Sequence, residues 1–146
     1  MTAHPTNPRT KCAASAEQYG SLDPWFGLEQ EDTFFEGRAP LGWPDNGFPA
    51  PQGGYYCGVG SDEIFGREVV NAHLQACIDA GLHISGINAE VKPGPWEFQI
   101  GPVAAPSVAD ELWPARWNLY RIADAFFGPK GHPTLATPPP HPVPRR

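Results

Sequence analysis

Positive charge and long apolar runs are scarce in this 146-residue chain. It has 10 lysines and arginines against 16 aspartates and glutamates, which gives a net charge of −6 at pH 7. This acidic balance argues against binding to a nucleic acid backbone, because such binding needs clustered Lys and Arg. No apolar run approaches the roughly 20 residues that a membrane-spanning helix needs. We therefore expect neither a nucleic-acid-binding protein nor a membrane protein.

Cysteine is also scarce, with only Cys12, Cys57 and Cys77 present. Their odd number and irregular spacing match neither a disulfide framework nor a metal-binding motif, which favours a reducing compartment. Residues 1–12 contain no apolar stretch of the kind that a secretory signal carries. We expect a cytoplasmic protein. A plastid or mitochondrial location is the alternative, because the segment before Glu17 is basic and contains no acidic residue.

Two glutamates stand two positions apart in Trp25–Glu31, a stretch that we predict to be a β-strand. Alternate side chains of a strand project to opposite faces, so Glu29 and Glu31 should share one face while Phe26 and Leu28 point to a core. Like charges on one face repel unless a cation neutralises them, and hard cations such as Mg²⁺ prefer carboxylate oxygens. A solvated strand face with two incidental glutamates is the alternative interpretation.

Residues 84–101 alternate apolar and polar side chains around the turn sequence Lys92–Pro95, which predicts a β-hairpin. With these four residues as the loop, Glu90 lies directly across from Glu97. Such a like-charge pair destabilises a sheet, and no lysine or arginine shares that face. The pattern therefore predicts a bound metal ion. The expected pairs are Val91 with Trp96, Glu90 with Glu97, Ala89 with Phe98, Asn88 with Gln99, Ile87 with Ile100, and Gly86 with Gly101.

Two main helices are predicted. The first has Ser61 as its N-cap and runs to Ala80, with Gly81 after its end. The second starts from a Ser107 cap and contains Pro114, which should kink it or mark its first turn. A shorter helix could cover Lys11–Tyr19. With at least three antiparallel strands, these helices give an α+β fold.

The remaining segments carry weaker signals. Turn-forming residues fill positions 37–60, which predicts either an ordered functional loop or a surface excursion held by its aromatic rings. His73 lies beside the apolar face of the first main helix, where a packing role is more common than a ligand role. Residues 128–146 are rich in proline, and we predict that they are disordered.

Short motifs of uncommon residue types run in order through the chain. They are Pro24–Glu31, Gly42–Pro44, Pro51–Gly53, Tyr55–Gly60, Gly66–Arg67, Ala72–His73, Ile84–Gly86, Asn88–Val91, Trp96–Pro102, Leu112–Trp113 and Ala115–Arg116. Together they resemble glutamine synthetases of the eukaryotic type, over roughly Lys11–Phe127. The resemblance implies that residues 21–127 form a partial catalytic domain of that family, in which antiparallel strands packed with two helices line a metal-filled funnel. Residues 1–20 would be an N-terminal segment and residues 128–146 a tail.

The resemblance also implies a reaction and a set of site residues. The family joins ammonia to L-glutamate through a γ-glutamyl phosphate, with ATP as co-substrate and Mg²⁺ or Mn²⁺ as cofactor, and it forms homo-oligomeric rings. Tyr56 and Asn88 correspond to residues near the substrate and ammonium sites. The implied metal ligands are Glu29, Glu31, Glu90 and Glu97. The implied nucleotide-binding residues are Glu29, Glu97, Phe98, Gln99, Ile100, Gly101 and Pro102.

The same resemblance implies that an N-terminal β-grasp domain and the second half of the catalytic domain are absent from this chain. We therefore expect the isolated chain to be inactive, and an inactive metal- and nucleotide-binding fragment is the alternative function. A third possibility is an interaction module that uses Pro138–Pro140 as a polyproline helix. Single departures from the family pattern include Asp32 for an aromatic residue, Gly54 for proline, Lys92 for methionine and Pro114 for a small or aliphatic residue.

Overall fold

One long strand, β1 (Trp25–Glu36), organises the molecule, which we describe from a computed structural model covering residues 3–45, 47–128 and 131–135. In this described part of the chain the sheet is antiparallel and five-stranded, in the order β2–β1–β4–β3, with β5 also paired to β1. The fold is α+β, as predicted. The other elements are α1 (Pro8–Tyr19), β2 (Ala39–Pro40), α2 (Arg67–Asp79), β3 (Ile84–Ala89), β4 (Pro95–Ala104), α3 (Ser107–Phe127) and β5 (Gly131–Leu135).

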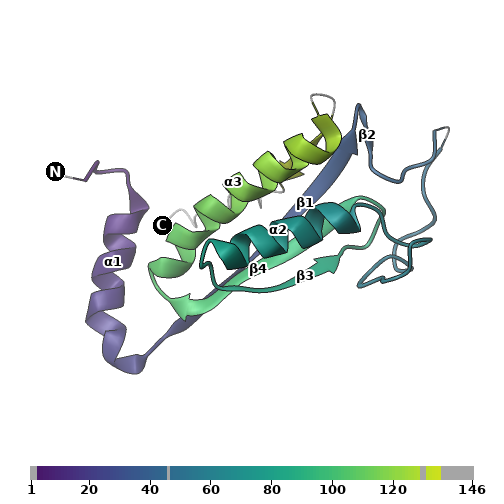
Figure 1. The fold of residues 1–146 in the computed structure, drawn as a ribbon. Helices are drawn as coiled ribbons and strands as arrows, with labels where there is room; N and C mark the ends of the chain where they lie inside the picture. The colour runs from purple at the N-terminus through teal and green to yellow at the C-terminus, as the bar shows by residue number, and fades with distance from the viewer. Residues whose placement is uncertain (1–2, 46, 129–130, 136–146) are drawn as a thin grey trace, which may run out of the picture.

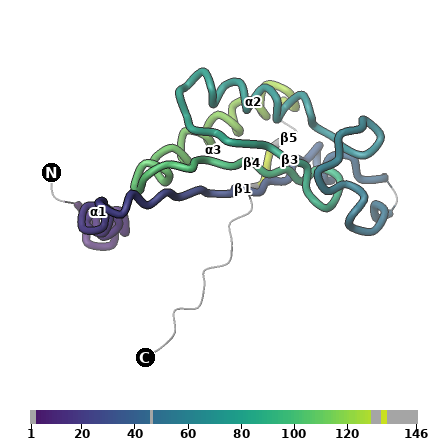
Figure 2. Tube along the Cα trace, turned by 90° about the horizontal axis from the view of Figure 1, so that it is seen from below, coloured from purple at the N-terminus to yellow at the C-terminus, as the bar shows by residue number. Residues whose placement is uncertain are grey.

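Helices α2 and α3 cover one face of the sheet, and α1 lies at one end of the molecule (Figures 1 and 2). The core lies between these two helices and the sheet and includes Phe34, Trp96, Phe98, Ile100 and Leu119. In the described part of the chain no helix covers the opposite face (Figure 2). The same described residues contain no helix long and apolar enough to cross a bilayer. We call the face that α2 and α3 do not cover the open face.

The face assignment in β1 is confirmed for both glutamates. Glu29 and Glu31 are exposed, whereas Gln30, Asp32 and Phe34 between and beyond them are buried. The prediction for Phe26 is wrong, since this side chain is 45% exposed. The pairing of β1 with β4 shifts just after Phe26 at a bulge, which disturbs the alternation of faces there.

The predicted hairpin register is wrong by two residues. Strand β3 ends at Ala89, which lies opposite Trp96, and Asn88 lies opposite Glu97. Because the error is an even number of residues, every side chain keeps its predicted face. Glu90 follows the end of β3, so it does not lie directly across from Glu97.

One hydrogen bond within the hairpin and one from β1 explain the shift. The Glu90 N–H donates to the Pro95 carbonyl (3.1 Å), which makes residues 91–94 the loop. The tip of that loop is held by β1, because the Phe34 N–H donates to the Gly94 carbonyl (3.1 Å). Gly94 has φ +93°, and a Cβ there would lie 2.8 Å from the Leu41 carbonyl oxygen. The strand next to the hairpin thus selects the loop.

The helices begin at positions other than the predicted ones. Helix α2 starts at Arg67 after Gly66, whose φ is +88°, so Ser61 is not its N-cap. Helix α1 starts at Pro8 and is capped by the Asn7 side chain, which accepts from the Arg9 N–H (3.0 Å). Helix α3 has Pro106 as its N-cap and Ser107 as its first residue.

Three other predictions about the helices can be compared with the structure. Gly81 follows α2 with φ +74°, as predicted for a residue that ends a helix. Pro114 lies inside α3 and not in its first turn. His73 is a buried packing residue, as predicted, with a ring nitrogen 2.9 Å from the Ala115 carbonyl oxygen and its ring against Phe98.

The tail prediction needs a partial correction. Gly131–Leu135 forms β5 and pairs with Asp32–Glu36 of β1, so this part of the segment 128–146 has regular structure. The proline run at 138–140 lies outside the described residues. The loop after β2 is held by Trp43, whose indole N–H donates to the Pro93 carbonyl (3.1 Å) and whose ring contacts Phe48. This contact fits a surface excursion held by its aromatic rings.

Candidate functional site

Acidic and amide side chains form two rows across the open face of the sheet. The strand register places Glu31 of β1 opposite Glu97 of β4, which in turn lies opposite Asn88 of β3. Side chains at directly paired positions have Cβ atoms about 4.5–5.5 Å apart. Glu31 and Glu97 are therefore near neighbours. The next row contains Glu29, Gln99 and Gly86, in the same strand order.

The Asn88 amide links these two rows. Its Nδ2 donates to Glu90 Oε1 (3.2 Å) and to Glu97 Oε2 (3.1 Å). Its Oδ1 accepts from Gln99 Nε2 (2.8 Å). The sequence pattern predicted that something positive must separate Glu90 from Glu97. In the structure a neutral amide with two N–H donors lies between them.

Electrostatics also identify the carboxylates as one group. Burial raises the pKa of Glu90, and the nearby charges of Glu97 and then Glu31 raise it further. Tyr56 lies at the margin of the same group. The pKa of its hydroxyl is raised mainly by Cys57, and to a smaller extent by Glu90, burial and Glu97. Tyr56 thus stays a neutral hydroxyl, exposed beside the carboxylates.

A cleft of about 530 Å³ opens next to the second row, between β1, β4 and the start of β3. Gly101 makes its wall possible, because φ is +104° there and a Cβ would lie 2.5 Å from the Phe26 carbonyl oxygen. Five of the seven predicted nucleotide-binding residues line this cleft. The residues lining it are Gly27, Leu28, Glu29, Ser85, Gln99, Ile100, Gly101 and Pro102.

The other two predicted nucleotide-binding residues lie elsewhere. Phe98 projects into the core with 2% of its surface exposed, so its side chain does not face the cleft. Glu97 belongs to the carboxylate group around Asn88. Ile100 is also fully buried, and it forms part of the cleft wall from the core side. A predicted contact run of consecutive strand residues therefore divides between two faces, as the alternation of side chains requires.

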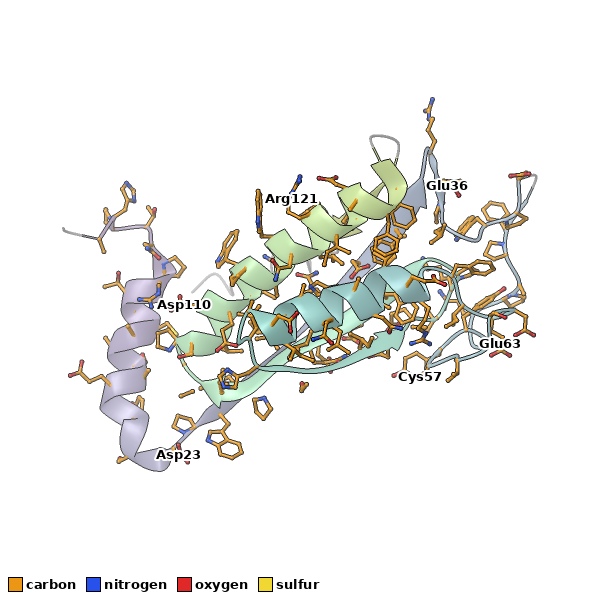
Figure 3. All side chains as sticks on the ribbon, in the orientation of Figure 1. Asp23, Glu36, Cys57, Glu63, Asp110 and Arg121 are labelled. Carbon is orange, nitrogen blue, oxygen red and sulfur yellow. The ribbon has the colours of Figure 1, made fainter. Side chains whose placement is uncertain are left out.

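A smaller cleft of about 280 Å³ reaches Asn88 from the β3 edge. Its residues include Cys57, which Figure 3 labels in the loop beyond the ends of α2 and β3, and Arg67. The Arg67 guanidinium donates to the Gly58 carbonyl (2.9 Å) and lies 4.6 Å from the centre of the Trp96 ring. Sequence reasoning assigned no role to Arg67. Its place in the Gly66–Arg67 motif, at the position where α2 begins, was the available signal.

The carboxylate oxygens are the type of ligand that a hard cation prefers, but they do not surround a metal position on all sides. In the part of the chain that is described, no group of three or more His, Cys, Asp or Glu side chains is arranged to hold a metal ion. Glu31, Glu90 and Glu97 are brought together, whereas Glu29 lies one row away, about 6.5 Å along β1. Mg²⁺ commonly uses one or two carboxylates and takes its other ligands from water and phosphates. The Glu90 and Glu97 pair beside Asn88 matches that pattern in its number of carboxylates.

No family model matches the chain, but several known proteins are highly similar to it. Glutamine synthetase of Streptomyces viridochromogenes is 62% identical over 126 residues, which is 86% of this chain and 37% of that protein. Glutamine synthetase of Frankia alni is 54% identical over 122 residues, 84% of this chain and 35% of that protein. Glutamine synthetase 2 cytoplasmic of Drosophila melanogaster is 53% identical over 123 residues, 83% of this chain and 33% of that protein.

This chain is a glutamine synthetase homologue. It spans about a third of the length of the curated relatives that it matches. The match covers 126 of the 146 residues, so 20 residues at the two ends together lie outside it. However these 20 are divided between the ends, residues 21–126 lie within the region of glutamine synthetase similarity. All of the candidate site residues fall in that range. These relatives come from two bacteria and one animal.

Proposed function

We propose that this chain carries the carboxylate face and nucleotide cleft of a glutamate–ammonia ligase. The reaction would join ammonia to L-glutamate at the expense of ATP, through a γ-glutamyl phosphate. The main support is the glutamine synthetase similarity across residues 21–126 together with one observation, the three glutamates gathered beside the cleft. The partners would be ATP, L-glutamate, ammonium and further copies of the chain in a ring. The compartment would be the cytoplasm, with a plastid or mitochondrion as the alternative.

The proposed division of labour follows the two rows. Glu31, Glu90 and Glu97 would hold Mg²⁺ or Mn²⁺ with their carboxylate oxygens, and Glu29 would bind a second ion on the nucleotide side. When bound, such an ion neutralises negative charge on the transferred phosphoryl group. Gly101 and Pro102 in the cleft wall would bind the nucleotide.

Two further residues would act on the substrate side of the carboxylates. Tyr56 would offer its hydroxyl as a hydrogen-bond donor, since a phenol with an ordinary pKa of about 10 is neutral at pH 7. Cys57, and to a smaller extent Glu90, raise this pKa further. Asn88 would keep its amide directed at Glu90 and Glu97. Neither role requires either side chain to change its protonation state.

Titration with Mn²⁺ tests the metal role. We expect the chain to bind the ion and the double substitution Glu90→Gln with Glu97→Gln to abolish binding, since both carboxylates next to Asn88 lose their charge. Isothermal titration calorimetry measures this directly. The matched control is Glu17→Gln with Glu68→Gln, which makes the same charge change at two exposed helical positions that line neither of the two clefts. Unchanged Mn²⁺ affinity in the first double variant would contradict the metal assignment.

A non-catalytic metal- and nucleotide-binding fragment is the second candidate function. It requires only the carboxylate group and the cleft of about 530 Å³ that the described residues contain. The two functions differ in the transfer of a γ-glutamyl group from glutamine to hydroxylamine, measured with Mn²⁺ and ADP present. We expect the 146-residue chain alone to form no γ-glutamyl hydroxamate. Measurable product would favour the ligase over the fragment.

A further inference from the structure

An unbroken series of hydrogen bonds connects the cleft to the carboxylates. Gln99 lines the cleft, and its Nε2 donates to Asn88 Oδ1 (2.8 Å). Asn88 Nδ2 in turn donates to Glu90 (3.2 Å) and Glu97 (3.1 Å). The Asn88 amide therefore has partners at both ends, because its oxygen accepts from Gln99 and its nitrogen donates to the two carboxylates.

The direction of the Asn88 amide depends on Gln99. An asparagine side chain can rotate so that its oxygen and nitrogen exchange places. Rotation here would direct the Asn88 oxygen at two carboxylates, which accept hydrogen bonds and cannot donate them when ionised. Donation from Gln99 Nε2 to the Asn88 oxygen favours the orientation that directs both N–H groups at Glu90 and Glu97.

Gly86 leaves the space in which Gln99 adopts this position. Gly86 lies opposite Gln99 in the sheet, and a Cβ at position 86 would come within 2.8 Å of Gln99 Oε1. That distance is too short for a carbon and an amide oxygen, so an alanine would displace the end of the Gln99 side chain. The glycine has no positive φ, so its backbone conformation accepts alanine.

We infer that Gln99 and Asn88 are positioning residues, which keep the Glu90 and Glu97 carboxylates directed at one point next to the cleft. This inference rests on the proposed function, because it gives that carboxylate pair a cation to bind. Outer hydrogen-bond partners of metal-binding carboxylates typically change metal affinity by about 10- to 100-fold when they are removed. Gln99 also borders the cleft, so a molecule bound there would contact the same amide.

The first test needs no metal. Side-chain amide proton exchange of Asn88 is measured by NMR on the full ¹⁵N-labelled chain, in the wild type, Gly86→Ala and Gln99→Leu. We expect faster exchange of the Asn88 amide protons in both variants, because Asn88 loses the partner that orients it. Gly20→Ala is the matched control, since a Cβ there would meet no atom within 4 Å. Unchanged exchange in both variants would overturn the inference.

The second test measures Mn²⁺ affinity by calorimetry on the same proteins. We expect Gly86→Ala and Gln99→Leu to weaken binding by about tenfold or more, and Gly20→Ala to leave it unchanged. Wild-type affinity in both variants would overturn the positioning role while the proposed function stands. A wild-type chain that takes up no Mn²⁺ would instead contradict the proposed function, and the exchange rates would still decide whether Gln99 orients Asn88.

Discussion

Polar side chains have different environments on the two faces of the sheet. On the open face three glutamates lie close together, and the Asn88 amide donates to two of them, Glu90 and Glu97. On the covered face two polar residues of β1, Gln30 and Asp32, are buried under the helices. Gln30 accepts from Arg116 Nε (2.7 Å), whereas Asp32 Oδ1 has no hydrogen-bond partner among the described residues.

The difference shows that location decides the cost of a carboxylate more than the number of like charges nearby. A partly exposed glutamate keeps most of its hydration, so a cluster of three is tolerated. A buried carboxylate loses its hydration and must be compensated by hydrogen bonds or by a proton. Strand position, which alternates between these two environments, thus sets which acidic side chains can bind ligands and which destabilise the fold.

The largest expected effect comes from adjacent residues on opposite faces of β4. Phe98→Ala should lower the free energy of unfolding by about 3–5 kcal/mol, because it leaves a cavity beneath α2 and α3. Glu97→Gln, one residue away, should change it by no more than about 0.5 kcal/mol. Urea denaturation followed by tryptophan fluorescence measures both. Equal losses would show that the two faces do not differ in packing as described.

A smaller effect of opposite sign is expected at Asp32. Replacing it with Asn removes a buried acidic group whose Oδ1 lacks a partner, and it should raise the free energy of unfolding at pH 7 by about 1–3 kcal/mol. The control is Glu31→Gln on the open face, which should stay within about 0.5 kcal/mol. Urea denaturation at pH 7 measures both. A loss of stability in Asp32→Asn would mean that Asp32 has a stabilising partner.

The same substitution has a defined pH dependence. Burial raises the pKa of Asp32 well above its usual range, so the folded state binds its proton more tightly than the unfolded chain does. Asp32 therefore contributes most to the stability of the wild type below its unfolded pKa of about 3.9. This contribution falls as the pH rises toward the folded pKa. The advantage of Asp32→Asn should thus shrink on acidification. If the stability advantage of Asp32→Asn grew at low pH, burial would have to lower the pKa of Asp32 and not raise it.

The smallest expected effect is confined to the open face. Glu97→Gln should lower the pKa of Glu90, because the charge of Glu97 is one of the causes that raise it. Burial is the larger cause, so the pKa should stay above its ordinary value. NMR titration of the Glu90 side-chain carbon measures the change. Glu63→Gln, an exposed site in the loop before α2, should leave the Glu90 pKa unchanged.

Residue alternation predicted correctly which strand residues are exposed and which are buried at these positions. The shared face of Glu29 and Glu31 and the burial of Trp96 and Phe98 follow from a period of two residues. The family followed from motifs, and relatives at 53–62% identity confirm it. The sequence did not predict that the Asn88 amide donates to both Glu90 and Glu97, because the predicted register placed Asn88 opposite Gln99.

Predictions that depended on local signals alone were less accurate. Ser61 has the composition of an N-cap, yet α2 begins at Arg67, because Gly66 makes its turn tightly against Leu41 and Phe34. Proline-rich composition predicted disorder where β5 pairs with β1. In both places a segment distant in sequence supplies the contacts that select the structure.

Faces of strands, helix-forming segments and family membership could therefore be read from the residues in order, since each depends on near neighbours or on motif identity. Three-dimensional packing alone decided the hairpin register, through the Phe34 N–H bonded to the Gly94 carbonyl, and it also decided which carboxylates meet. The physical reason is that a two-residue slip preserves every face, so no periodic pattern can distinguish the two registers. Only contact with the adjacent strand makes one of them lower in free energy.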